Sequence, residues 1–135
     1  SSGNWDSVWN NWLRIAAGLS ESRRPVILSG TVLPDTLDGC DDRYRFAPVH
    51  YVALHCDDAA REDRLRARPA WRGWTDERIE KQRKFAQWLL DHAKTDFEPP
   101  LRIVDTSGAS VAETAKQVRD WATDNWSTWS ERHTQ

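Results

Sequence analysis

The sequence has little of what several classes of protein require. Its 135 residues contain only two cysteines, Cys40 and Cys56, with no C-x-x-C pair and no histidine at metal-ligand spacing. This argues against a zinc site and leaves a disulfide open but unsupported. No apolar run approaches the ~20 residues of a membrane span, and the N-terminus lacks the charged and apolar regions of a signal peptide. These absences predict a reduced, cytoplasmic protein whose residues 1–135 form a single domain.

The chain also lacks a strong excess of charge of either sign. It has 19 lysines and arginines against 21 aspartates and glutamates, for a formal net charge of -2. No overall field therefore recruits nucleic acid or an anionic membrane, and we expect neither as a partner. Any phosphate site must be local, and the densest local positive charge is the run of arginines between Arg61 and Arg72.

This run belongs to the segment 57–74, which directly follows an apolar stretch and has two interpretations. Arginine stays charged, and its planar fork matches phosphate oxygens, so the segment can be an anion-binding site. Acidic residues such as Asp58 and Glu62 lie among the arginines, so it can equally be a solvated helix face with internal ion pairs. Local composition alone does not separate the two.

Three short apolar runs predict buried strands, at residues 26–30, 50–56 and 101–105. Each is nearly continuous in apolar residues, which is typical of parallel strands covered by helices on both faces. The runs end in small or polar residues, Ser29-Gly30-Thr31, His55-Cys56-Asp57 and Asp105-Thr106-Ser107-Gly108. In an open parallel sheet, ligands bind outside the carboxyl ends of the strands. Convergence of these three ends with the arginine segment favours the anion-site interpretation.

About four helices are expected, over residues 4–19, 58–67, about 76–94 and from Ser110 onward. Pro69 ends the second because the residue before a proline is pushed out of the helical region. Thr75 is suited to cap the third, and Ser110 with Glu113 forms a capping box for the last. Alternation of helices and strands along the chain predicts an α/β fold with parallel strands.

Two further residue types do not by themselves indicate a site. The nine tryptophans mostly fall at helical spacing on apolar stripes, where packing in a core or an interface explains them. An exposed tryptophan stripe on the first helix would favour a homodimer. The aspartates between Asp35 and Asp42 lack the glycine and terminal glutamate of a calcium loop, so we expect a solvated acidic loop and no metal ligands from the chain.

In this order of parts, the chain resembles the C-terminal part of a small P-loop kinase, related to the adenylate, shikimate and gluconate kinases. Residues 26–31 resemble the strand beside the phosphate loop. The segment from Arg64 to Arg72 resembles the Arg-x-x-x-Arg segment and the arginine-bearing lid, at about 58–75. Residues 105–108 resemble the loop near the adenine. The resemblance covers nearly the whole chain, and the order of parts is more specific than any one motif.

The resemblance implies an ATP-dependent phosphotransferase of the nucleoside or nucleotide kinase type, with ATP, Mg²⁺ and a small-molecule phosphoryl acceptor. It implies that Arg64 lies against the adenine, that Arg68 reaches nucleotide phosphates and that Arg72 closes with the lid. Arg68 and Arg72 would then serve catalysis by stabilising charge on the transferred phosphoryl group. The other implied nucleotide-binding residues are Ser29, Gly30, Asp105, Thr106 and Ser107. Capping of the local turn is an equally good role for Asp105.

The sequence departs from this family at the phosphate loop. That loop needs two glycines five apart followed by Lys and Ser or Thr, and here no lysine follows any glycine. The central strand before the loop is missing too, so we expect an incomplete, three-stranded sheet. The gap left by the missing strand would be closed by pairing of residues 26–29 with 51–56, or by exchange of elements between chains. The chain alone is expected to be inactive, and the alternative is a non-catalytic, degenerate kinase-like module that binds a nucleotide or another protein.

Overall fold

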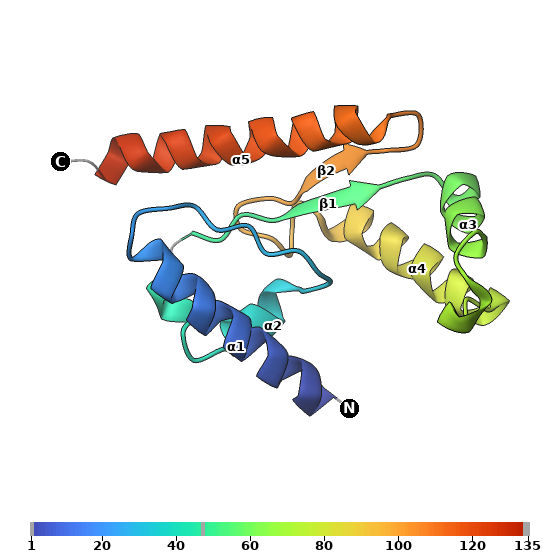
Figure 1. Ribbon diagram of the computed structural model, residues 1–135, viewed down its shortest axis with the longest axis horizontal. Coiled ribbons are helices and arrows are strands. Elements are labelled where there is room, and N and C mark those ends of the chain that lie inside the picture. Colours follow the sequence, from blue (N-terminus) through green and yellow to red (C-terminus); the bar gives the residue numbers. More distant parts are fainter. Residues whose placement is uncertain (1, 47, 134–135) are drawn as a thin grey trace. The chain divides into compact units, whose positions relative to one another are not determined.

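The computed structural model describes the backbone of residues 2–46 and 48–133 and divides the chain into two compact units, Ser1–Val49 and His50–Gln135 (Figure 1). Each unit has a core of its own. Within the described ranges, no helix combines the length and apolarity that crossing a membrane requires.

The first unit is helical. It contains α1 (Ser2–Ser20), the short α2 (Pro34–Asp38) and a 3-10 turn, η1 (Arg43–Arg45). Its core consists of Trp9, Leu13, Ala16, Ala17, Leu37 and Cys40. The first four recur at steps of four, three and one along α1, which is the buried stripe of an amphipathic helix. The Asn10 side chain accepts a hydrogen bond from the Asp41 backbone N–H at 2.9 Å and ties the loop after α2 to the helix. The helix expected over residues 4–19 is confirmed.

The strand expected at residues 26–30 is not formed. These residues belong to no helix or strand, and Ile27 is 63% exposed. The expected pairing of residues 26–29 with 51–56 is therefore wrong in this structure. An apolar, β-branched run is stabilised as a strand by its neighbours, so the same residues without a ladder partner stay irregular. The carboxyl-terminal residues Ser29 and Gly30 accordingly end no strand.

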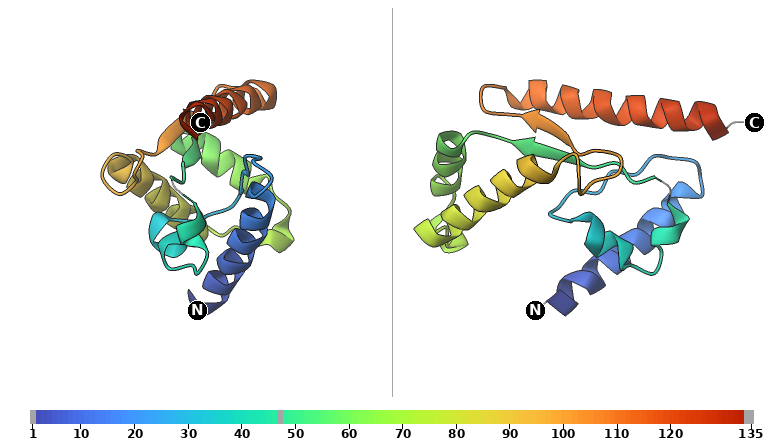
Figure 2. Two further views of the ribbon diagram at one scale, coloured as in Figure 1. Left: turned by 90° about the vertical axis from the view of Figure 1, so that its left-hand side faces the viewer. Right: turned by 180° about the vertical axis from the view of Figure 1, so that it is seen from behind.

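The second unit holds a two-stranded parallel sheet of β1 (Val52–His55) and β2 (Arg102–Asp105). The register places Val52 opposite Arg102 and His55 opposite Asp105. The helices are α3 (Asp58–Arg66), α4 (Asp76–His92) and α5 (Val111–His133), with a 3-10 turn η2 (Ala70–Arg72) between α3 and α4. Figures 1 and 2 show α4 and α5 on opposite sides of the sheet. The α/β prediction is confirmed, and the described residues form two strands instead of the expected three and five α-helices instead of about four.

Side-chain caps position the helices of this unit. Thr75 accepts a hydrogen bond from the Arg78 N–H and begins α4, as expected. Ser110 and Glu113 exchange two hydrogen bonds, 2.9 and 3.1 Å long, which is the expected capping box before α5. The core consists of Leu65, Ile79, Ala93, Phe97, Leu101 and Val104. Leu65 anchors α3 in this core, so the arginines on either side of it are carried on a fixed helix.

Candidate functional site

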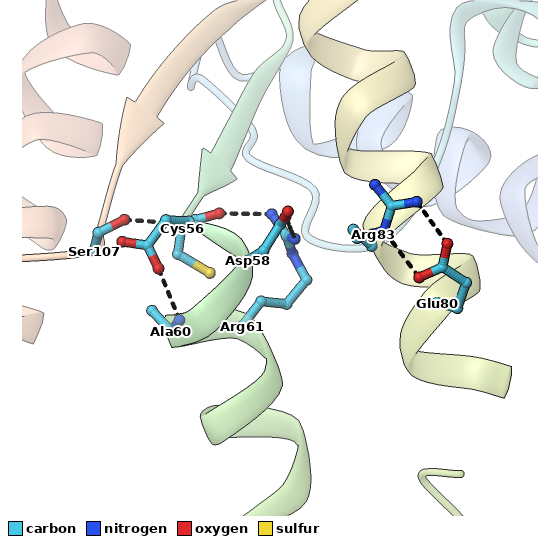
Figure 3. Close-up of polar contacts among 8 residues, drawn as sticks. Cys56, Asp58, Ala60, Arg61, Glu80, Arg83 and Ser107 are labelled. Atoms are coloured by element: carbon cyan, nitrogen blue, oxygen red, sulfur yellow. Dashed lines mark hydrogen bonds and ion pairs between the residues drawn. The ribbon is translucent and has the colours of Figure 1, made fainter. Parts of the chain in front are cut away.

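The carboxyl ends of β1 and β2 lie at the same edge because the strands are parallel (Figure 3). Two hydrogen bonds join the segments that follow them. The Asp57 backbone N–H donates to the Ser107 hydroxyl at 2.8 Å. The Thr106 backbone N–H donates to the His55 carbonyl at 2.6 Å. The turn after β1 and the loop at residues 105–108 are thus one connected platform, as predicted for two of the three expected strand ends.

Asp57 begins helix α3 at this platform. Its Oδ1 accepts a hydrogen bond from the Ala60 N–H at 2.8 Å, with a backbone of φ -64° and ψ 166°. An extended residue whose carboxylate binds the first-turn amides is a standard N-cap. The negative charge also lies at the positive end of the helix dipole. The helix start is therefore occupied by the chain's own carboxylate.

Arg64 connects helix α3 to the loop after β2. Its Nη1 donates to the Thr106 hydroxyl at 2.8 Å and its Nη2 to the Thr106 carbonyl at 2.9 Å. The Thr106 hydroxyl in turn donates to the His55 carbonyl at 3.1 Å. Two contacts to one residue fix the plane of the guanidinium group. Among the described residues, no carboxylate lies within ion-pair distance of the exposed Arg64, so its charge is not neutralised within these ranges.

Asp105 has a local role in the loop. Its Oδ1 accepts a hydrogen bond from the Ser107 N–H at 2.8 Å, which closes a turn of the Asx type. Hydrogen bonds from the Ser107 backbone and side chain, with the charge of His55, lower the pKa of this carboxyl group. The structure thus shows the turn-capping role of Asp105. Contact with a nucleotide stays a prediction.

The neighbouring arginines on α3 are used differently. Arg61 pairs with Asp58 at 2.7 Å and donates to the Cys56 carbonyl at 2.6 Å (Figure 3). Arg66 pairs with Glu62 at 2.9 Å and with Asp76 at 2.6 Å. Hydrogen bonds from Asp76 and then Glu62 raise the pKa of Arg66. The ion-paired interpretation is thus realised at Arg61 and Arg66, whereas anion binding by the segment stays a prediction.

Arg68 and Arg72 stack on tryptophans after α3. The Arg68 guanidinium carbon lies 5.2 Å from the centre of a Trp74 ring, and that of Arg72 lies 4.8 Å from Trp71. In the described part of the chain, neither Arg68 nor Arg72 forms a hydrogen bond or ion pair with the 105–108 loop, which Arg64 binds. The structure thus groups Arg64, Thr106 and Ser107 but keeps Arg68 and Arg72 in a separate cluster.

Ser29 and Gly30 belong to the first unit and to no helix or strand. A Cβ atom added at Gly30 would lie 3.0 Å from Cζ2 of Trp9. A side chain there would force Trp9 to shift. The close approach to a core tryptophan gives Gly30 a packing role, whereas its predicted contact with a nucleotide is untested.

The residues of the platform are a poor match for a metal ion. Mg²⁺ prefers carboxylate and other oxygen ligands, but no group of three His, Cys, Asp or Glu residues in the described ranges could hold an ion. At the platform, Asp57 caps α3 and Asp105 closes the loop turn. These residues do not fit a Mg²⁺ site.

A shallow cleft of about 150 Å³ lies between the sheet and α4. Its lining includes Leu54, Cys56, Arg61, Phe85 and Leu89. Arg61 is already engaged by Asp58 and Cys56, and the rest of this lining is largely apolar. No disulfide joins Cys40 and Cys56, so the one left open by the sequence is not formed.

Comparisons of the chain with protein-family models, with curated proteins and with solved structures give no match in any of the three. The function of the platform is therefore argued from its chemistry.

Proposed function

We propose that the chain binds the base end of an adenine nucleotide at the carboxyl edge of β1 and β2. In this proposal it is the adenine-side and lid part of an ATP-dependent phosphotransferase of the nucleoside or nucleotide kinase type. The contact between Arg64 and Thr106, 42 residues apart in sequence, is the observation that carries it. These are two of the residues for which the sequence predicts nucleotide binding.

The chemistry of a flat base suits this arrangement. A guanidinium group is planar and delocalised and stacks well on aromatic faces. Hydrogen bonds to Thr106 orient that plane, so Arg64 is organised before a ligand arrives and little freedom is lost on binding. Beside it, Gly108 borders open space, since an added Cβ atom would meet nothing within 4 Å. The exposed loop leaves room for a ring against Arg64.

The finer features of the proposal are roles for the remaining predicted residues. Arg68 and Arg72 would contact phosphates, and Ser29 and Gly30 would contribute to the nucleotide site of a P-loop-kinase-like sheet. A cytoplasmic location is proposed with it, supported by the absence of a disulfide between Cys40 and Cys56. Because no lysine follows a glycine in the sequence, we propose nucleotide binding by this chain and not phosphoryl transfer by it alone.

A protein-interaction module is the second candidate, and one surface favours it. Helix α1 carries a stripe of apolar side chains between 39% and 54% exposed, made of Val8, Trp12, Ile15 and Leu19. Such a stripe at helical spacing is typical of a helix that packs on a partner, and a homodimer is the partner we propose. Sedimentation of the protein and of an Ile15→Asp variant tests this: the parent should be dimeric and the variant monomeric. A monomeric parent contradicts it.

Nucleotide binding is tested by thermal unfolding with and without ligand. A ligand that binds only the folded state raises the unfolding temperature, by about 2.7 kcal/mol of stability at 100 times its Kd. ATP and adenosine should both raise it, and Arg64→Ala should remove both shifts. Arg66→Ala removes an arginine two residues away and should keep both. Arg68→Ala should weaken the shift with ATP and leave that with adenosine.

Two results would overturn the proposal. One is the absence of any shift in the parent at millimolar ATP. The other is an equal loss of the shift in Arg64→Ala and Arg66→Ala, because the effect would then follow from overall charge instead of the Arg64 platform.

A further inference from the structure

A cluster of arginines and tryptophans occupies the connection between α3 and α4. We call it the Arg–Trp cluster, and its members are Arg68, Trp71, Arg72, Trp74 and Arg78. Arg68 and Arg78 both stack on Trp74, with guanidinium carbons 5.2 and 4.4 Å from ring centres. Arg72 stacks on Trp71 at 4.8 Å. Sequence analysis missed the contribution of Arg78 and Trp74, although the interleaving of arginine and tryptophan at positions 68–78 was a signal for it.

The backbone of the cluster is held in place. Arg78 Nη1 donates to the Arg72 carbonyl at 2.7 Å and to the Gly73 carbonyl at 2.8 Å. Gly73 has a left-handed backbone, with φ 67° and ψ 38°, which glycine adopts without strain. The turn is thus fixed by a side chain from α4, so Trp71 and Arg72 are presented on a defined loop.

The charges of the cluster are not neutralised by the chain. Arg61, Arg66 and Arg83 each pair with a carboxylate, but among the described residues none of Arg68, Arg72 and Arg78 has a carboxylate within ion-pair distance. At the same place, Trp71 is 78% exposed, although burying a tryptophan is strongly favourable. A solvated charged surface needs no exposed tryptophan, and a core tryptophan would not be exposed.

We propose that the Arg–Trp cluster is a binding site for a phosphorylated nucleobase. The base stacks on Trp71, and the arginines hold phosphate oxygens. Stacking on an aromatic side chain tolerates every base, because each base has a π-face. Arginine adds the forked hydrogen bonds that phosphate takes. Arg68 and Arg72 are also the arginines that the proposed function assigns to phosphates, but stacking of a base on Trp71 does not rest on that function.

Free mononucleotides and units of a single-stranded nucleic acid share this chemistry. The small net charge of the whole chain gives no long-range attraction to nucleic acid, so recognition depends on the local cluster in either case. Surfaces that bind single strands repeatedly combine a base stacked on an aromatic side chain with phosphates bound by positively charged side chains. Trp71 and the arginines of the cluster would provide both.

The test is fluorescence anisotropy with a labelled oligouridylate of about 12 nucleotides, a length within the range of single-strand sites. We expect the full chain to bind it, and Trp71→Ala to weaken binding about tenfold, as loss of one stacked base does. Trp71→Phe should restore most of the affinity. Arg72→Gln should reduce the slope of log K against log salt by about one. Arg66→Ala, which removes an ion-paired arginine outside the cluster, is the matched control and should bind as the parent does.

Competition with unlabelled UMP and with pyrophosphate identifies the ligand. Equal affinity for UMP and the oligonucleotide indicates a free nucleotide, and tighter binding of the oligonucleotide indicates a single strand; both support the site. Three results overturn it: no binding by the parent, a Trp71→Ala variant with the parent's affinity, or competition by pyrophosphate as strong as that by UMP. In the last case the cluster binds anions without reading a base. Circular dichroism of each variant confirms that it is folded.

Discussion

Arginines on the two sides of helix α3 have different roles. Arg66 on one side is neutralised by Glu62 and Asp76. Arg64, two residues earlier, has no carboxylate partner in the described part of the chain and binds the loop after β2 through Thr106. Successive even-numbered positions lie about 200° apart around a helix, so a two-residue step moves an arginine from the ion-paired side to the platform.

The difference shows that position relative to a strand end matters more than the density of charge. The turn after β1 and the loop after β2 meet only because the strands are parallel and in register. Arg64 is the arginine of α3 that reaches that loop, whereas Arg61 turns back to Cys56 and Asp58. Counting arginines would not distinguish them.

The largest effect should come from Leu65, which anchors α3 between these two sides. Leu65 is 7% exposed, and truncating a buried leucine to alanine costs about 2–5 kcal/mol. Leu65→Ala should lower the unfolding free energy by that amount in urea titrations followed by circular dichroism. It should also weaken both the Arg64–Thr106 contact and the Arg66 ion pairs. A loss well below 1 kcal/mol would show that α3 is not anchored through Leu65.

A smaller effect should follow from removing the N-cap of α3. Asp57→Ala leaves the Ala60 N–H without its 2.8 Å acceptor, and loss of an N-cap costs about 0.5–2 kcal/mol. Because Asp57 lies at the platform, the variant should also weaken nucleotide binding. Substitutions on the opposite side of α3, such as Arg66→Ala, should leave nucleotide binding unchanged. The unfolding free energy and the ATP-induced shift in unfolding temperature measure the two effects. Asp57→Ser, which can still cap the helix, is the control.

Arg66→Ala should have a still smaller effect on stability. Exposed ion pairs contribute little because solvent screens them and both side chains lose freedom. The decrease in stability should shrink further in high salt, and nucleotide binding should be unchanged. Denaturant titrations at two salt concentrations check this. A variant that loses the ATP-induced shift would remove the distinction between the two sides of α3.

The smallest expected effect is a change in folding stability with pH. The pKa of Asp105 is below its ordinary value of 3.8 in the folded state, first because of the Ser107 backbone hydrogen bond. The folded state therefore favours the ionised form. The stabilisation of the folded state by the ionised Asp105 is complete above the ordinary pKa. It is lost as the pH falls through the lowered pKa of the folded state. Asp105→Asn keeps an acceptor without the charge, so its stability difference from the parent should be constant above about pH 5 and shrink below the ordinary value. A pH-independent difference contradicts the assignment.

Local signals in the sequence predicted much of this unit. The helix break before Pro69, the Thr75 cap and the Ser110–Glu113 box all depend on neighbours within a few residues, so the sequence suffices. The parallel strands at β1 and β2 were also predicted, because continuous apolar runs between helical segments have few other structures.

Features that depend on distant partners were not predictable in the same way. The run at 26–30 has the composition of a strand but forms none, because a strand requires a neighbour that composition does not specify. The sequence predicted that the arginine segment and the 105–108 loop converge, but it did not predict the particular contact of Arg64 with Thr106. The stacking of Arg78 on Trp74 depends on how α4 leaves the turn at Gly73. The sequence could suggest which residues were candidates but not which of them share a site.

The central claim is that a nucleotide base binds between Arg64 and the 105–108 loop. Amide chemical shifts of the ¹⁵N-labelled protein during titration with ATP test it most directly. We predict saturable shifts at Thr106, Ser107 and Gly108, absent in Arg64→Ala and retained in Arg66→Ala. Gly39, in the first unit, should not shift. Unchanged amides at the 105–108 loop with millimolar ATP would contradict the account.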